Sequence, residues 1–385
     1  MLPFNFSFPV KLVFGVGNLS EIGRLAKETG MKPLLVTGKS SSKKTGHIEK
    51  ITDLLEKEQL AYRIYDEAES NPSEEGVQKG AAAALEAECD FVIAVGGGSV
   101  LDTGKGIAFR VLNNESLFSE SLAEEAPRVL PLIAVPTTVG SGSQVSSLAV
   151  FSNPDNRAKT LVKSACFYPK TALVDPELLT TLPKNLVGAM GISVLSHAME
   201  SYVANKGTPL TDMLSLRAIQ LVVENLAYVF ENPLDVKAWY GIALADIFSG
   251  MALDSAGPVL LHGLFHPLAA MDEKLVHGEG LAPILPEWMG YTKNAATLKF
   301  SNIARVLGKE TRGMALIDAA EKSIAAVNEL IEKLDLPKNL KALGFQKEQL
   351  DFLAERAMKN MKTAISNNPR VPGREEIKSL YARCL

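Results

Sequence analysis

Four of the chain's five histidines fall within one stretch of sequence that otherwise has the pattern of buried helix. They are His197, His262, His266 and His277. Neutral imidazole is the commonest side-chain ligand for zinc, copper and iron, so this grouping indicates a metal centre. Each histidine taken alone could equally be a core residue whose ring is hydrogen bonded to a carbonyl. The grouping favours the metal.

A run of glycines in the first half of the chain follows an apolar segment and opens a helical one. Residues 96–99 read Gly-Gly-Gly-Ser, after a predicted buried strand over residues 91–95. Glycines let the backbone approach a pyrophosphate, and the first amides of the next helix point at it with the positive end of the helix dipole. The run matches neither of the usual nucleotide-binding fingerprints, so an ordinary tight turn is the alternative.

A second polar loop, over residues 136–144, follows another apolar strand and contains Thr137 and Thr138. Small hydroxyl residues among glycines suit a loop that packs against a ligand and donates hydrogen bonds to it, although a plain linker can look the same. Ligands of open α/β folds bind where strands end at one edge of a parallel sheet. The two loops together therefore predict a dinucleotide site.

The choice between NAD and NADP depends on the segment over residues 38–44, just past a predicted strand over residues 33–37. An acidic residue at such a strand end would bind the ribose hydroxyls of NAD and repel a 2′-phosphate. The segment instead contains Gly38, Ser40 and several lysines, which would accept that phosphate. The pattern favours NADP and leaves NAD possible; an exposed polar turn with incidental lysines is the alternative.

The elements that must position these residues change character near residue 183. Before it, continuous apolar strands are spaced by helices, which is typical of a parallel sheet covered on both faces. The predicted strands span residues 33–37, 61–65, 91–95, 130–135, 148–151 and 172–174, and the helices between them residues 47–58 and 75–88. After it, long helical periods predict helices over residues 186–204, 209–229, 236–255, 259–269 and 283–289. We predict an α/β dinucleotide-binding domain over residues 1–184 and an all-α metal and substrate domain over residues 185–385.

Length and composition agree with a two-domain protein that acts on small molecules. The chain has 385 residues, with 40 Lys and Arg against 44 Asp and Glu. A net charge of -4 offers no basic surface for nucleic acid and no polybasic membrane anchor. Three scattered cysteines, and the lack of a signal-peptide pattern or a long apolar span, predict a cytoplasmic protein. A strand-like segment over residues 10–14 could pair as an exposed edge, so we expect a homodimer or larger oligomer.

With these motifs in this order, the chain resembles the iron-containing (group III) alcohol dehydrogenase family. The likeness covers nearly the whole length, from residues 14–17 (Phe-Gly-Val-Gly) through residues 174–177 (Val-Asp-Pro-Glu) and His197 with Glu200 to residues 368–370 (Asn-Pro-Arg). It implies the dehydroquinate synthase-like fold, with a dinucleotide-binding domain, a helical domain and hydride transfer in the cleft between them. The resemblance implies that the cofactor is lined by Gly97, Gly98, Ser99, Asp102, Thr137, Thr138 and Lys159, and Gly38 with Ser40 matches members that use NADP.

The resemblance also implies a metal held by one aspartate and three histidines. His197, His262 and His277 match the histidine positions, but Ser193 stands where the family has its aspartate. A serine hydroxyl is a poor metal ligand, so the site loses one negative charge. Three histidines and a water can still hold zinc, whereas the intrinsically weaker ferrous iron would be lost first. Asp254, about two turns before His262, is a candidate for the missing charge.

These observations predict an NAD(P)-dependent alcohol dehydrogenase or aldehyde reductase for a small substrate, with Fe2+ or Zn2+ acting on the substrate oxygen. His266, one turn beyond His262, could relay the proton or could simply pack in the core. Two alternatives remain. One is a metal-independent reductase of the maleylacetate reductase type, in which His197, His262 or Ser193 donates hydrogen bonds to the substrate oxyanion. The other is a nucleotide-binding protein that is not an enzyme. It is suggested by the loss of two of the family's carboxylates, which Ser193 and Gln144 replace here.

Overall fold

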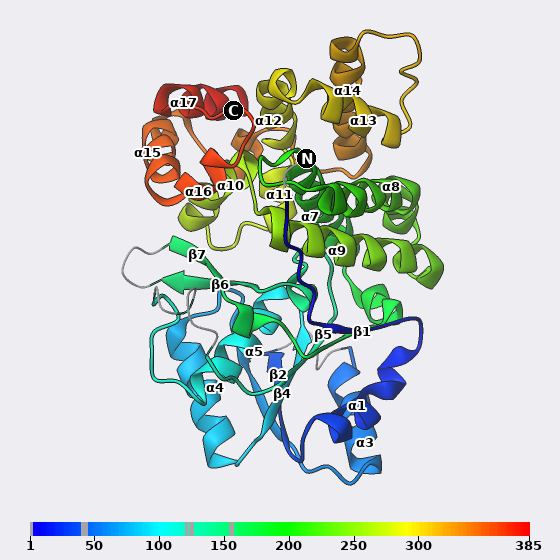
Figure 1. Ribbon diagram of the computed structural model, residues 1–385, viewed down its shortest axis with the longest axis vertical. Helices are drawn as coiled ribbons and strands as arrows, with labels where there is room; N and C mark the ends of the chain where they lie inside the picture. Colours follow the sequence, from blue (N-terminus) through cyan, green and yellow to red (C-terminus); the bar gives the residue numbers. More distant parts are fainter. Residues whose placement is uncertain (1–2, 40–44, 120–121, 123–126, 154–157) are drawn as a thin grey trace. The chain divides into compact units, whose positions relative to one another are not determined.

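The computed structural model describes residues 3–39, 45–119, 122, 127–153 and 158–385. Its internal contacts divide the chain into two compact units, which can be followed by colour in Figure 1. One unit comprises Phe8–Leu182, and the other comprises Pro183–Leu385 together with Met1–Ser7. The residues before Phe8 thus group with the helical unit, whereas the sequence pattern assigned them to the sheet domain.

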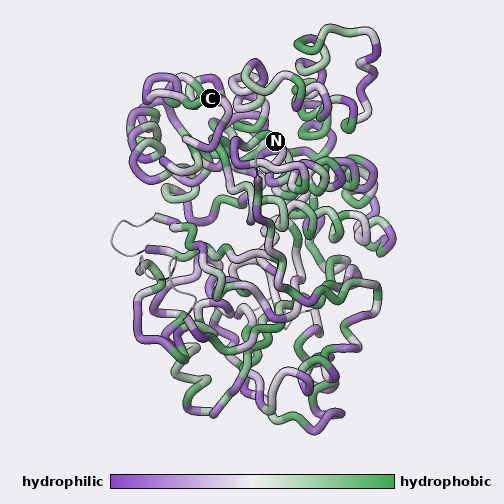
Figure 2. Tube along the Cα trace, viewed as in Figure 1, coloured by the Kyte–Doolittle hydropathy of each residue, from purple (hydrophilic) through white to green (hydrophobic). Residues whose placement is uncertain are grey.

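The described strands of the first unit include six that form one parallel sheet, in the order β1-β8-β5-β4-β2-β3. They are β1 (Lys11–Phe14), β2 (Pro33–Gly38), β3 (Arg63–Ala68), β4 (Phe91–Gly96), β5 (Leu132–Pro136) and β8 (Thr171–Val174). Every residue of β4, β5 and β8 is buried, which is why their sequences are almost continuously apolar (Figure 2). The predicted α/β fold with a parallel sheet is confirmed.

Helices cover both faces of this sheet. They are α1 (Ile22–Thr29) and α3 (His47–Lys57) on one face, and α4 (Glu74–Glu86) and α5 (Gly98–Arg110) on the other. Alternate residues of β4 show the division, because Val92 and Ala94 pack in the core with α4 and α5, whereas Ile93 and Val95 pack with α1 and α3. The two cores hold the carboxyl ends of the strands at one edge.

The strand order reverses at β2, which has β3 on one side and β4 on the other. In open parallel sheets, ligands bind beside the carboxyl ends of strands at such a switch point. Gly38 ends β2, Gly96 ends β4, and Gly96 is in register with Pro136 at the end of β5. The three segments proposed from sequence to bind the cofactor therefore begin at one edge of the sheet.

One predicted strand of the parallel sheet was wrong. The apolar run over residues 148–151 forms β6 (Leu148–Asn153), which pairs antiparallel with β7 (Ala158–Lys163) in a separate two-stranded sheet. Its apolar side chains do not need the main sheet, because Ala149 and Phe151 pack into the core formed with α4 and α5. A short apolar run alone does not distinguish these two kinds of burial.

The second unit is helical in all its described regular structure. Its helices are α7 (Lys184–Val203), α8 (Pro209–Glu231), α9 (Val236–Ala256), α10 (Leu260–Met271), α11 (His277–Leu281), α12 (Leu285–Thr292), α13 (Thr297–Val306), α14 (Leu316–Lys333), α15 (Leu350–Asn360), α16 (Lys362–Ser366) and α17 (Arg374–Arg383). The predicted helices over residues 186–289 are found with ends shifted by a few residues. α7, α8 and α9 pack against one another, and nearly every side of α7 is buried.

By length and composition alone, α8 could cross a membrane, and so could α9 and α10 taken as a pair bent by 100°. Buried core helices pass the same test, and 44% of the α8 window is buried within the unit. α9 and α10 are separated by Gly257, whose φ of 73° is a backbone conformation that glycine adopts more readily than any other residue. Pro258 follows it, and this turn sets the direction of the helix that carries His262.

Candidate functional site

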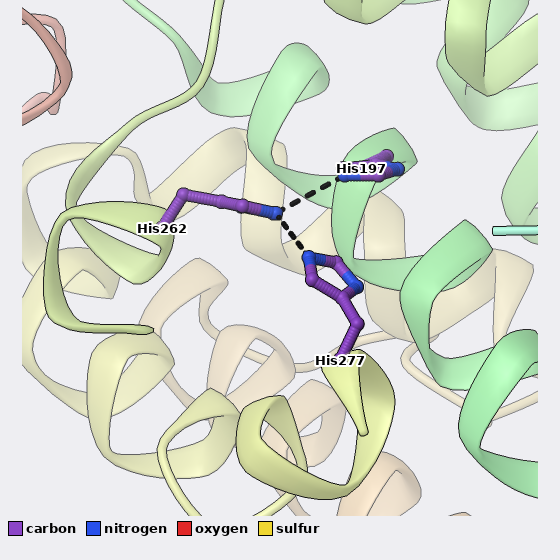
Figure 3. A group of neighbouring side chains, drawn as sticks. All are labelled: His197, His262 and His277. Atoms are coloured by element: carbon purple, nitrogen blue, oxygen red, sulfur yellow. Dashed lines mark hydrogen bonds between the residues drawn. The ribbon is translucent and has the colours of Figure 1, made fainter. Parts of the chain in front are cut away.

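Three histidine rings converge in the helical unit, from α7, α10 and α11 (Figure 3). The Nε2 atom of His262 lies 3.1 Å from Nε2 of His197 and 3.1 Å from Nε2 of His277. One ring nitrogen from each of the three lies within 4.8 Å of the others, and the rings of His197 and His262 stack with centroids 4.8 Å apart. The histidines that the sequence predicted as ligands therefore meet at one point.

The polar residues of α7 that reach this point lie on one stripe of the helix. Ser193, His197 and Glu200 are spaced by four and three residues, so their side chains project from the same face. All three are buried, with exposed fractions of 3%, 5% and 0%. Buried polar side chains on an otherwise apolar helix need partners, and both Ser193 and Glu200 find theirs at the other two histidines.

Glu200 holds His262 and the start of α10 at once. Its Oε2 atom contacts Nδ1 of His262, while its Oε1 accepts hydrogen bonds from the backbone amides of Val259 and His262 at 3.0 and 3.1 Å. α10 has no side-chain cap of its own, so the Glu200 carboxyl group supplies one. The same group thereby fixes the helix end and the ring that the helix carries.

Ser193 contacts His277 in the way that Glu200 contacts His262. Its Oγ atom lies 2.8 Å from Nδ1 of His277 and donates to the carbonyl of Ala189 at 3.1 Å. α11 comes close to α7 here because residue 278 is glycine: a Cβ built on Gly278 would lie 1.7 Å from the Ala189 oxygen. The approach of the two backbones brings His277 within reach of Ser193.

Burial keeps two rings of this cluster neutral, those of His197 and His262. It lowers the pKa of His197 and the pKa of His262 to about 3. Burial also raises the pKa of Glu200 to about 8, against the effect of its two backbone hydrogen bonds. Neutral imidazole is the form that binds a metal.

The donor set fits a metal ion. For metal–nitrogen bonds of about 2.0–2.1 Å, two nitrogens of a tetrahedral site lie about 3.3 Å apart, close to the observed 3.1 Å. A single proton on His262 Nε2 could bond to only one of the neighbouring nitrogens, whereas a cation would satisfy all three. Glu200 and Ser193, beside the Nδ1 atoms of His262 and His277, are the outer partners that metal-bound histidines usually have.

Two other residues that the sequence proposed for this site lie outside the three-nitrogen group. His266 is one turn along α10, with its ring centroid 5.9 Å from that of His262 and 5.7 Å from that of Phe265. Asp254 is buried on α9 and is not a member of the group of ligand atoms. The turn at Gly257 and Pro258 separates α9 from α10, which carries His262.

In the sheet unit, the glycine loop and the threonine loop lie against each other. The amide of Thr137 donates to the carbonyl of Gly96 at 3.0 Å. A Cβ on Gly97 would lie 3.0 Å from Oγ1 of Thr138, and one on Gly98 would lie 2.7 Å from Cβ of Ser141. Glycine is thus required where the start of α5 meets the second loop. α5 opens at Gly98. The amides of Val100 and Leu101 donate to the carbonyl of Gly97 at 2.9 and 3.1 Å, and the amides of Gly98 and Ser99 come before the first of these bonds.

Asp102 lies beneath these loops and joins three segments. Its Oδ1 accepts from the Ser143 hydroxyl at 2.6 Å and its Oδ2 from the Val150 amide at 2.9 Å; burial raises its pKa. One turn along α5, the Nζ of Lys105 donates to the carbonyls of Ser146 and Leu148 at 3.0 and 2.6 Å. Asp102 and Lys105 therefore attach the threonine loop and the β6–β7 hairpin to α5.

The residues proposed from sequence to bind the cofactor also include Ser99, Lys159, Gly38 and Ser40. Ser99 donates its hydroxyl hydrogen to the carbonyl of Ser70 at 2.6 Å. Lys159 lies on β7, opposite Ser152 of β6. Gly38 ends β2, and Ser40 lies outside the described residues.

Sequence reasoning gave no role to three residues that organise these sites. Glu200 could have been found from its spacing, three residues after a histidine on a buried helix. Lys105 carries the weaker signal of a lysine in an otherwise apolar helix. Nothing in the sequence pattern indicates a role for Asn367. Its side chain donates to the carbonyls of Ala256 and Pro258, at 2.9 and 3.0 Å, in the turn before α10.

Comparison with known proteins gives the same picture along the whole chain. Residues 9–176 match the family model described as iron-containing alcohol dehydrogenase, and residues 188–385 match the model for the C-terminal part of that family. The chain is 31% identical to 1,3-propanediol dehydrogenase of Klebsiella pneumoniae, over 98% of each chain. It is 30% identical to the NAD-dependent methanol dehydrogenase of Bacillus methanolicus, over 99% of this chain and 100% of that one.

Solved structures are also similar to this chain over its whole length. The alcohol dehydrogenase of Oenococcus oeni matches with a TM-score of 0.95 and 32% identity, over 100% of both chains. The sheet, the helical unit and the order of their motifs are those that the resemblance implied. The chain belongs to the iron-containing alcohol dehydrogenase family.

Proposed function

We propose that this protein is an NAD(P)-dependent alcohol dehydrogenase or aldehyde reductase that transfers hydride between nicotinamide and a small alcohol or aldehyde. The observation that carries the proposal is the convergence of three imidazole nitrogens, two of them on buried side chains, in a member of this family. The activities named for its relatives, on propanediol and methanol, support a small substrate with a CH–OH group.

His197, His262 and His277 would hold the metal, either Zn2+ or Fe2+. The ion would supply Lewis acidity to the substrate oxygen. The chain's own residues prepare the site: Glu200 and Ser193 orient two of the imidazoles, and burial keeps two of the rings neutral and limits competing water. A metal-independent reductase is disfavoured because Nε2 of His262 can form a hydrogen bond with only one of its two neighbouring ring nitrogens, whereas a shared cation would contact all three.

The dinucleotide would lie on the loops at the carboxyl edge of the sheet. Gly97, Gly98 and Ser99 would offer backbone amides to the pyrophosphate, and Thr137 and Thr138 their hydroxyl groups. The bound dinucleotide would supply or accept the hydride. Asp102 would act by holding these loops together, since both of its oxygens accept protein hydrogen bonds.

We infer a preference for NADP from the segment that begins at Gly38. It offers glycine, Ser40 and lysines where an acidic residue would exclude a 2′-phosphate. Lys159, whose carbon chain emerges from β7, would contribute positive charge to the same cofactor. His266 would relay the proton to or from the substrate oxygen.

The wider setting is also a proposal. A small-molecule substrate, a cytoplasmic location and no nucleic-acid or membrane partner follow from the balanced charge and the sequence pattern. β1 lies at the edge of the sheet, where pairing with a second copy would give the dimer or larger oligomer that we expect.

The proposal is tested by following NADPH and NADH consumption with a panel of short aldehydes, before and after the protein is loaded with zinc or ferrous iron. We expect metal-stimulated turnover, faster with NADPH than with NADH. The variant Gly38→Asp should reverse the cofactor preference, because its carboxylate would bind ribose hydroxyls and repel the 2′-phosphate. Tight NADPH binding without turnover on any aldehyde would instead indicate a non-enzymatic nucleotide-binding protein.

A further inference from the structure

The hydroxyl group of Ser193 contacts the histidine nitrogen that faces away from the cluster. Nε2 of His277 points toward His262, and Nδ1, on the other side of the ring, lies 2.8 Å from Ser193 Oγ. A ligand in the place of the family's aspartate would instead direct its oxygen at the point where the three Nε2 atoms meet. The observed contact gives Ser193 a different part in the site.

The direction of the hydrogen bonds follows from the number of hydrogens available. A serine hydroxyl has one hydrogen, and that of Ser193 is donated to the Ala189 carbonyl at 3.1 Å. The contact with His277 must then be made by the ring, whose Nδ1–H donates to Oγ. A neutral imidazole carries one N–H, so Nε2 of His277 is left with a free lone pair directed at the cluster.

The same holds for His262 when the Glu200 carboxylate accepts a hydrogen bond from its Nδ1–H. Two outer oxygens, one from Ser193 and one from Glu200, then select the metal-binding tautomers of two rings. The Nε2 atoms of the three histidines, which face one another, then form an inner set of neutral ligands. A negative charge on Glu200 would lie on the far side of the His262 ring from these nitrogens.

We propose that Ser193 is a positioning residue that fixes the tautomer and orientation of His277, and that it leaves a neutral three-nitrogen metal site that selects zinc over ferrous iron. The inference rests on the metal site of the proposed function. An imidazole set binds zinc more tightly than ferrous iron by intrinsic affinity. A carboxylate at residue 193 would add an anionic oxygen to the inner set and narrow that difference, since oxygen ligands suit the harder ion.

The test measures metal binding and not turnover. The metal-free chain is titrated anaerobically with Zn2+, Co2+ and Fe2+ in competition with a chromophoric chelator, and the visible absorption of the Co2+ form reports its coordination. We expect Ser193→Ala to weaken Zn2+ and Co2+ binding by about 10- to 100-fold, the usual effect of losing an outer partner. Ser193→Thr, which keeps the hydroxyl group, should restore most of the affinity.

Ser193→Asp tests the charge. It should strengthen Fe2+ binding more than Zn2+ binding and change the Co2+ spectrum, because an oxygen ligand enters the inner set. The matched control is Ser323→Ala on α14, a helix that contributes no ligand to the cluster. Ser323 is buried and donates to the carbonyl of Ala320 at 2.6 Å, much as Ser193 donates to that of Ala189. This variant should bind all three metals as the unmodified chain does.

The outcomes separate the two proposals. Tight Zn2+ binding by the unmodified chain, with the same affinity in Ser193→Ala, would overturn the role of Ser193 and leave the metal site standing. A Co2+ spectrum that changes in Ser193→Ala as if an oxygen ligand had been lost would also overturn it, because Ser193 would then be a ligand. Failure of the unmodified chain to bind any of the metals would overturn both the inference and the proposed metal site.

Discussion

Gly278 and Ala189 bring α11 and α7 into backbone contact: a Cβ on Gly278 would lie 1.7 Å from the Ala189 carbonyl oxygen. That oxygen also accepts the hydrogen bond from Ser193, whose hydroxyl group contacts His277, the residue before Gly278. The glycine therefore sets the separation of two helices that carry parts of the candidate metal site. A backbone atom cannot move aside as a flexible side chain can, so any larger residue must push the helices apart.

Gly278→Ala is predicted to reduce the free energy of unfolding by at least about 1–3 kcal/mol, the usual cost of overpacking, and to weaken zinc binding. Gly290→Ala on α12 is the control, because its Cβ would find only Ile324, at 4.0 Å. Within a helix, that replacement should be neutral or stabilising by about 0.5–1 kcal/mol. Denaturant unfolding and zinc titration of both variants check the prediction; equal behaviour would contradict the role given to Gly278.

Gly98→Ala is predicted to weaken dinucleotide binding. The new methyl group would lie 2.7 Å from Cβ of Ser141, so the threonine loop would have to move away from the start of α5. An overpacking cost of about 1–3 kcal/mol corresponds to a loss of about 5- to 100-fold in affinity. Fluorescence titration with NADPH measures it, with Gly290→Ala again as the control. An unchanged dissociation constant would show that the dinucleotide does not need this loop geometry.

Lys105→Met is predicted to destabilise the sheet unit. Lys105 is 1% exposed and donates to the carbonyls of Ser146 and Leu148, so its loss leaves buried acceptors without a donor, at a cost of about 2–5 kcal/mol. Lys79→Met is the matched control. Lys79 is 60% exposed and pairs with Glu75 on the surface, where solvent screening leaves the loss with little effect on stability. Chemical unfolding of the two variants should differ clearly, and similar midpoints would contradict the structural role of Lys105.

His47 should make the sheet unit less stable in acid. It is buried at the start of α3, its Nδ1 has no hydrogen-bond partner among the described residues, and burial lowers its pKa from 6.5. The nearby Lys50 lowers the pKa further, while Asp175 and Glu49 oppose it. The unfolded chain therefore binds a proton below pH 6.5 that the folded chain does not, so this contribution is present above pH 6.5 and is lost as the pH falls.

The measurement is the unfolding midpoint in denaturant between pH 7.5 and pH 5, roughly the range over which an ordinary histidine titrates. His47→Leu removes the group, so the variant should lose less stability over this range than the unmodified chain. Parallel pH profiles for the two proteins would show that His47 does not carry the effect.

Much of the sheet unit could be predicted because its signals are local. β2, β4 and β5 are almost continuously apolar and each ends in glycine or proline, so their burial and their ends are visible in the sequence. β6 has the same apolar pattern and was therefore assigned to the main sheet. Its partner β7 is more polar and was not predicted. The difference lies in a long-range pairing that a short apolar run does not encode.

The histidines of the metal site were found for a similar reason, since residue type and grouping are local properties. The roles of their partners were not. Glu200 reaches His262 across 62 residues of sequence, and Ser193 reaches His277 across 84. The sequence showed that Ser193 replaces a ligand, but only the packing of α11 on α7 shows which nitrogen it contacts. The turn at Gly257 likewise separates Asp254, on α9, from the helix that carries His262.

If three histidines hold one metal on which turnover depends, the activity of the metal-free chain must rise with the amount of metal it binds. Zinc is added in fractions of an equivalent while NADPH oxidation by a short aldehyde is followed. We expect no turnover without metal, a linear rise to one equivalent per chain and no further increase, with this response lost in His262→Ala. Turnover that is complete in the metal-free chain, or a response that survives His262→Ala, would contradict this expectation.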